Sequence, residues 1–153
     1  VRSSAASDVY KRQAPIYIAW SVTNRSPLIR IPVTRGEGTR VELRCPDSAA
    51  NPYLTLAVCL QAGLDGIRNQ IEPPAAVTEN VFEMRMSQKN KLGIEELPAD
   101  LGEALAEFEK DEYLQNVLGR HATGKYIEAK KSEWADYRAQ VSDWEINNYL
   151  YKI

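Results

Sequence analysis

The decisive stretch for predicting the structure of this chain is Asn24–Asp47, NRSPLIRIPVTRGEGTRVELRCPD. It contains two short runs with the composition of β-strands, Leu28–Val33 and Arg40–Cys45. Between them lies a loop with Gly36 and Gly38, and glycine is common in tight turns because it adopts backbone angles that other residues avoid. The stretch therefore predicts a β-hairpin, whose register the sequence leaves open.

The second run alternates charged and apolar side chains without a break. Arg40, Glu42 and Arg44 occupy every second position. Because successive side chains of a strand point to opposite faces, these groups are predicted on one face of a central strand, spaced by about 6.6 Å. Arg25 and Arg30, on the preceding turn and strand, would add positive charge. Guanidinium groups beside a carboxylate can receive a phosphate and a divalent metal, and a solvated face with weak ion pairs is the alternative.

Composition limits the class of protein. The chain has 153 residues, of which 44% are hydrophobic and 26% charged, as in an ordinary soluble domain with a core. Its net charge of −2 argues against a nucleic-acid partner bound mainly by electrostatics. No run reaches the roughly 18 apolar residues of a membrane span, so no membrane association is expected. Cys45 and Cys59 are predicted to be buried free thiols, in keeping with a cytoplasmic protein.

The first 13 residues, VRSSAASDVYKRQ, differ in character from the rest. They are rich in serine and alanine and show no period. We expect residues 1–13 to be a foreign or disordered leader and residues 14–153 to form the domain.

The clearest helix signal follows the hairpin. Asn51 is a suitable N-cap, and Pro52 suits the first helical position because its missing N–H would have no partner there. The helix is predicted to reach about Asn69. The run Tyr53–Leu60 is mostly apolar, which favours a helix buried on most sides.

The other segments complete a prediction of an α+β fold. Ile16–Val22 reads as a buried strand, and Glu72–Pro98 is loop-like because it has several prolines and little period. Helices are expected over an apolar stripe from Leu101 to Phe108, after a cap at Asp111, and over Thr123–Gln140, where Glu128 and Lys131 would pair.

The C-terminal segment Trp144–Ile153 reads WEINNYLYKI and is aromatic with few charges. Such side chains are typical anchors of protein interfaces, so the segment is predicted to pack on another subunit. Folding back on its own helices is the alternative.

Four sequence motifs resemble those of a known protein family. NRSPLIRIP at 24–32, RVELR at 40–44, PDSAANPYL at 46–54 and AGLDGI at 62–67 resemble the C-terminal part of a type I glutamine synthetase. The resemblance covers roughly Ala14–Ile153. It implies antiparallel strands from the C-terminal part of the catalytic domain, followed by several helices.

The resemblance also implies an activity and a site. The family makes glutamine from glutamate, ammonia and ATP through γ-glutamyl phosphate, with Mg²⁺ or Mn²⁺. By this likeness Arg25, Arg30 and Arg40 contact ATP, Arg44 binds glutamate, and Glu42 binds a metal. Arg25 and Arg44 would also act in the phosphoryl-transfer step.

Three positions depart from the family pattern or match none of it. Gln13 stands where the family usually has a glutamate in a flap over the site, and we leave it out of the site. Phe82 stands where one branch has a tyrosine that is adenylylated, so the chain resembles the branch controlled by feedback and protein partners. His121 matches no site histidine and is expected at the surface or as a cap.

The resemblance implies partners as well. The family forms a homo-oligomer of twelve subunits in a double ring, and some members of this branch bind a transcriptional regulator. With one metal-binding carboxylate in the matched residues, the chain alone is predicted to be inactive. The alternative is a non-catalytic glutamine-synthetase-like paralogue that serves as an assembly or regulatory module.

Overall fold

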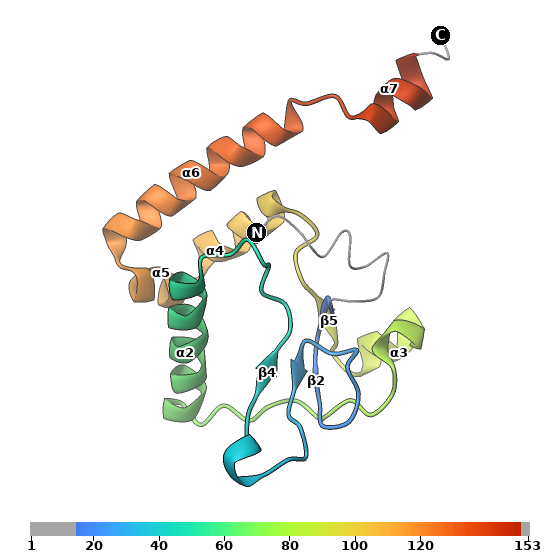
Figure 1. The fold of residues 1–153 in the computed structure, drawn as a ribbon, viewed down its shortest axis with the longest axis vertical. Helices are drawn as coiled ribbons and strands as arrows, with labels where there is room; N and C mark the ends of the chain where they lie inside the picture. Colours follow the sequence, from blue (N-terminus) through green and yellow to red (C-terminus); the bar gives the residue numbers. More distant parts are fainter. Residues whose placement is uncertain (1–14, 151–153) are drawn as a thin grey trace. The chain divides into compact units, whose positions relative to one another are not determined.

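The computed structural model describes residues 15–150 (Figure 1). The chain divides into two compact units between Ala104 and Leu105. The first unit holds the strands and α2, and the second holds most of the later helices. Small sheets and several helices make a mixed α+β fold, as predicted. The proposed leader at residues 1–13 lies outside the described residues and stays a prediction.

A three-stranded sheet carries the decisive stretch. It consists of β2 (Trp20–Ser21), β3 (Ile29–Arg30) and β4 (Glu42–Leu43). β2 is parallel to β3, and β3 is antiparallel to β4. The predicted pairing of the two runs is therefore confirmed, with a 3₁₀ turn, η1 (Gly36–Gly38), in the connecting loop.

The position of β4 differs from the prediction. β4 lies at the edge of the sheet in the order β2–β3–β4, whereas the alternation suggested a central strand. Two of the three apolar residues of the alternating run, Val41 and Leu43, are exposed, and the third, Cys45, is half-buried. The alternation indicates that the two faces of the strand differ. It predicts neither the order of the strands in the sheet nor the residues that cover each face.

The run predicted as one buried strand, Ile16–Val22, is divided between two sheets. β1 (Tyr17–Ile18) pairs antiparallel with β5 (Glu95–Glu96), and β2 pairs with β3. Tyr17, Ala19 and Ser21 are buried, while Ile18 is exposed. The prediction of a fully buried strand is thus wrong, because the chain changes partner at Ala19 and buries every second residue.

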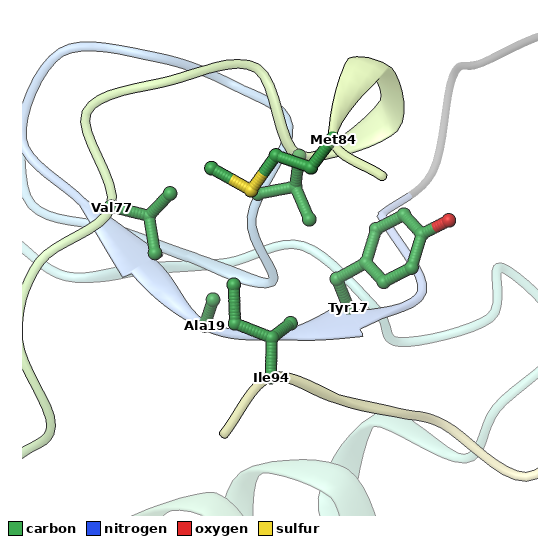
Figure 2. Close-up of a cluster of buried hydrophobic side chains, with 6 residues drawn as sticks. Tyr17, Ala19, Val77, Met84 and Ile94 are labelled. Carbon is green, nitrogen blue, oxygen red and sulfur yellow. The ribbon is translucent and has the colours of Figure 1, made fainter. Parts of the chain in front are cut away.

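The hydrophobic core lies between β1 and the segment that follows α2. Figure 2 shows Tyr17 and Ala19 beside Val77, Met84 and Ile94. The loop-like segment Glu72–Pro98 therefore supplies most of this core, contrary to the prediction. It contains η2 (Val81–Glu83), α3 (Met86–Lys91) and β5. Elements of six residues or fewer are too short to show a hydrophobic period, which is why the pattern missed them.

Helix α2 (Pro52–Arg68) confirms the predicted boundaries. The Asn51 side chain accepts hydrogen bonds from the backbone N–H groups of Tyr53 and Leu54, and Asn69 is the C-cap. The burial of α2 differs from the prediction. All of its residues are described, and none of them is buried. Tyr53 is 82% exposed and Leu56 68% exposed, so the prediction of a helix buried on most sides is wrong for this chain.

Three of the remaining helices follow the predicted order: α4 (Leu101–Lys110), α5 (Glu112–Leu118) and α6 (Arg120–Arg138). A fourth, α7 (Asp143–Tyr149), lies at the C-terminal segment, where no helix is predicted. Asp111 caps α5 as expected, and Leu101 and Leu105 of the apolar stripe are buried.

Two details of α6 differ from the prediction. The helix starts three residues before Thr123, because Gly119 with its positive φ ends α5 and α6 begins at once. Glu128 pairs with Lys125 rather than Lys131, and Lys131 instead reaches Glu109.

The C-terminal helix and the cysteines complete the description. Ser142 caps α7, and Trp144 and Tyr149 are exposed. The last three residues of the predicted interface segment lie outside the described part. Cys45 and Cys59 are free thiols, as predicted, but are half-buried rather than buried. Within residues 15–150, no helix combines the length and apolar character needed to cross a bilayer.

Candidate functional site

The centre of the candidate site is the carboxylate of Glu42, held between two guanidinium groups. Arg30 Nη1 lies 3.0 Å from Glu42 Oε2, and Arg40 Nη2 lies 2.8 Å from Oε1. Arg30 faces Glu42 because the β3–β4 register pairs the two residues. Arg40 precedes Glu42 by two positions, so the contact between them confirms that they share a face.

The arginines change the acidity of Glu42. The hydrogen bond from Arg30, and then that from Arg40, hold the pKa of the Glu42 carboxyl below its usual range, against partial desolvation. The Glu42 side chain is 28% exposed, so solvent weakens these pairs without separating them. Glu42 is therefore ionised at neutral pH.

Arg44 joins the same group of charges. Its Nη1 donates a hydrogen bond to the backbone carbonyl of Arg25, and its own backbone N–H bonds Leu28 across the sheet. Burial, and then the nearby Arg25 cation, lower the pKa of the Arg44 guanidinium, while Glu42 acts in the opposite direction. The structure thus brings together all five residues that the sequence singled out, Arg25, Arg30, Arg40, Glu42 and Arg44, which we call the arginine cluster.

One buried donor in the arginine cluster has no partner within the described residues. Arg30 Nε is buried and makes no hydrogen bond. A buried unpaired donor is unfavourable, so such groups in folded proteins usually meet an acceptor. An anionic ligand or another part of a larger protein would supply one.

The turn before β3 contains side chains that the sequence reasoning did not single out. Asn24 and Ser26 flank Arg25, and both make hydrogen bonds to residues far along the chain. An Asn-x-Ser sequence in a predicted turn is a known signal for local side-chain bonding, but its distant partners carry no sequence signal.

A metal site is only partly present. Among the described residues there is no group of three or more His, Cys, Asp or Glu side chains that fits a metal ion. Glu42 offers one carboxylate, and both of its oxygens bond arginines. The residues described here therefore do not fit a divalent metal by themselves.

The remaining predicted positions lie apart from this chemistry. His121 is exposed in the first turn of α6, as expected, and lines a surface hollow with Arg120 and Lys125. Phe82, in η2, packs its ring edge-on against Tyr17 at 5.5 Å between ring centroids. Gln13 lies outside the described residues.

Comparison with known proteins assigns the chain to a family. Residues 8–149 match the family model described as the glutamine synthetase catalytic domain. The chain belongs to the glutamine synthetase family. The match confirms the resemblance seen in the decisive stretch, and the site roles implied by that resemblance stay predictions.

Individual relatives agree with the family model. The chain is 51% identical to the glutamine synthetase of Clostridium saccharobutylicum over 148 residues, which is 94% of this chain and 33% of that protein. It is 48% identical to the Thermotoga maritima enzyme over 93% of this chain and 34% of that protein. The chain thus spans about a third of the length of the glutamine synthetases it matches, and corresponds to a C-terminal part of them.

A solved structure shares the fold. The structure named "GmaS/ADP complex-Conformation 1" superimposes with a TM-score of 0.78 at 37% identity. The similarity covers 90% of this chain and 30% of that one. That protein was solved with ADP, as its name states.

Proposed function

We propose that this chain forms part of the ATP and glutamate site of a glutamine synthetase, an ATP-dependent glutamate–ammonia ligase. The observation that carries the proposal is the arginine cluster: the guanidinium groups of Arg30 and Arg40 bond the Glu42 carboxylate, and Arg44, with Arg25 beside it, adds positive charge nearby. So much uncompensated positive charge suits an anionic reactant. Membership of the glutamine synthetase family supplies the reaction class.

Arg25, Arg30 and Arg40 would bind the phosphates of ATP. Phosphoryl transfer spreads negative charge over the oxygens of the transferred group, and catalysis rests mainly on placing positive charge beside them. A guanidinium presents several N–H donors in a fixed plane, so it can hold two phosphate oxygens at once. The unpaired Nε of Arg30 fits this role.

Arg44 would bind the substrate glutamate and stabilise charge during transfer to its γ-carboxylate. The hydrogen bond to the Arg25 carbonyl orients the Arg44 guanidinium. The remaining N–H donors of the group are then available to a carboxylate.

Glu42 would contribute one ligand to a divalent metal in the complete enzyme. Mg²⁺ or Mn²⁺ prefers carboxylate oxygens and, when bound, neutralises phosphate charge. Other carboxylates of that enzyme must complete the coordination, because the described residues lack them.

The proposal extends to assembly and location. The complete enzyme would be a cytoplasmic homo-oligomer, a dodecamer by family likeness, with ammonia as its third substrate and a transcriptional regulator as a partner. The exposed aromatic residues of α7 support an interface there.

Steady-state kinetics test the proposal in a complete glutamine synthetase that carries residues 14–153 as its C-terminal part. Arg25→Ala should raise the KM for ATP, and Arg44→Ala the KM for glutamate, each about tenfold or more with lower kcat. A lost charge-assisted hydrogen bond accounts for that size. Arg68→Ala, which removes an exposed arginine at the end of α2, is the control. Unchanged kinetics in both site variants would refute the assignment.

A second function is a non-catalytic paralogue that acts in assembly or regulation. The exposed apolar residues of α2 and α7 are the observation in its favour. Such a protein would bind other subunits without turnover, and substitutions in the arginine cluster would leave that binding unchanged.

A further inference from the structure

The turn that carries Arg25 is held by its two neighbours. Asn24 Nδ2 donates to the backbone carbonyls of Val77, at 3.2 Å, and Glu79, at 3.0 Å. Asn24 Oδ1 accepts from both the backbone N–H and the hydroxyl of Ser26, at 3.0 and 2.8 Å. The Asn24 side chain therefore uses its amide oxygen within its own turn and its amide nitrogen to bond a segment 53 or more residues further along the chain.

Ser26 provides a second connection to the same distant segment. Its hydroxyl oxygen accepts a hydrogen bond at 3.0 Å from the backbone N–H of Val81, the most deeply buried residue of the core. Ser26 is itself buried. The Val77 end of the segment is also fixed, because its backbone N–H bonds the carbonyl of Trp20. The segment 77–81 is therefore a firm support, and Figure 2 shows its Val77 end packed beside the strand at Ala19.

This turn sets the place of two arginines. Arg25 lies between Asn24 and Ser26 in the chain, so the two anchors fix its backbone. The carbonyl of Arg25 in turn accepts the hydrogen bond from Arg44 Nη1. A shift of the turn would move both guanidinium groups together.

Charge repulsion between Arg25 and Arg44 acts against this placement. The Arg25 cation lowers the pKa of Arg44, which shows that the two positive groups lie close enough to repel. Asn24 and Ser26 hold them in place with neutral hydrogen bonds. Unlike a carboxylate, they leave the positive charge free to meet an anion.

We propose that Asn24, together with Ser26, is a positioning residue that holds Arg25 and Arg44 in register for ATP and glutamate, and that it does so by fastening their turn to the segment 77–81. The inference rests on the proposed function. It adds that the active-site arginines depend on a segment outside the site itself.

The test compares Asn24→Ala with Asn80→Ala in the complete glutamine synthetase described above. Asn80 is a matched control because it lies on the same supporting stretch, but within residues 15–150 its side chain bonds the nearby Phe82 and Glu83 rather than the turn of Arg25. Both changes remove an amide and its local hydrogen bonds. Ser26→Ala is the second variant, because it cuts the bond to Val81 without touching Asn24's bonds to Val77 and Glu79.

We expect Asn24→Ala to raise the KM values for ATP and glutamate about tenfold or more, since displacements of about 1 Å can cost as much as 100-fold. Ser26→Ala should change both KM values in the same direction, and Asn80→Ala should leave them within twofold. Mere loss of folded enzyme lowers the apparent kcat at constant KM, so the KM values separate positioning from stability.

Two results are distinguishable failures. If Arg25→Ala and Arg44→Ala alter the KM values but Asn24→Ala and Ser26→Ala behave like Asn80→Ala, the positioning role is overturned and the proposed function stands. If none of the arginine variants alters kinetics, the proposed function fails first. Should Asn24→Ala not fold, Ser26→Ala decides the outcome alone.

Discussion

At the scale of single residues, the pair formed by Arg30 and Glu42 makes a prediction about pH. Arg30 lowers the pKa of Glu42 in the folded protein, so the folded state binds this proton less readily than the unfolded state. The pair therefore adds stability above the usual pKa range of a glutamate and loses it as the pH falls through the folded value. A ¹³C NMR titration of the Glu42 carboxyl should show a midpoint below that of an exposed glutamate.

Arg30→Ala is the variant that checks the cause. Removing the largest favourable hydrogen bond should move the Glu42 midpoint upward, with Arg40 left to hold the remaining oxygen. A midpoint that stays where it was would mean that Arg30 does not contact Glu42 in solution.

Residues near each other in sequence were the predictable ones. The alternation at Arg40 and Glu42 placed them on one face, because side-chain direction in a strand follows from position alone. The pairing of Arg30 with Glu42 needed the register of the hairpin, which the loop did not specify. The bonds of Asn24 to Val77 and Glu79 needed the whole fold, because hydrogen bonds over more than 50 residues leave no local pattern.

At the scale of elements, the start of α2 allows a measurement of its cap. Asn51→Ala removes the acceptor for the backbone N–H groups of Tyr53 and Leu54. We expect a loss of about 1 kcal/mol in the free energy of unfolding, as for other N-caps. Asn51→Ser keeps an oxygen acceptor and should lose much less. Equal losses in chemical denaturation would show that the side-chain cap contributes little.

The turn η2 makes a prediction about regulation. Phe82 has no phenolic oxygen, and its ring packs against Tyr17. An adenylyltransferase with ATP should therefore leave this turn unmodified, as judged by the intact mass of the protein. A mass increase equal to one AMP, mapped to residues 80–84, would contradict the proposed branch.

Elements with strong end signals were predictable, and short ones were not. The cap at Asn51 and the proline after it fixed the start of α2. The sequence of Glu72–Pro98 predicts a loop, yet the segment supplies Val77, Val81 and Met84 to the core. Its elements are stabilised by packing against β1, and they are too short to show a hydrophobic period in the sequence.

At the scale of the whole molecule, the C-terminal segment makes a prediction about assembly. Trp144 and Tyr149 form an edge-on aromatic pair with ring centroids 5.6 Å apart, and both are exposed. Aromatic side chains of this kind gain most when a partner excludes water. Deleting Asn147–Ile153 from the complete enzyme should shift its oligomer to smaller species on size exclusion. Unchanged elution on dilution would instead favour a segment that folds on its own subunit.

Burial was the property least predictable from sequence at this scale. The apolar run Tyr53–Leu60 suggested a helix covered on most sides, and the structure leaves it open. An apolar sequence shows that burial of the helix surface would be favourable, but only a structure shows which residues bury it. Among the described residues nothing buries any position of α2, and the chain spans about a third of the length of the relatives it matches.

The proposed function requires the arginine cluster to form part of a phosphoryl-transfer site that carboxylates from elsewhere in a glutamine synthetase complete. A divalent metal such as Mg²⁺ binds about six ligands, and among the described residues of the cluster Glu42 supplies one carboxylate. The most direct test is ATP-dependent glutamine formation by the purified 153-residue chain with Mg²⁺ or Mn²⁺, beside the complete enzyme. We expect weak, salt-sensitive nucleotide binding and no turnover by the chain, with full turnover by the enzyme. Turnover by the chain alone, lost in Glu42→Ala, would contradict the claim.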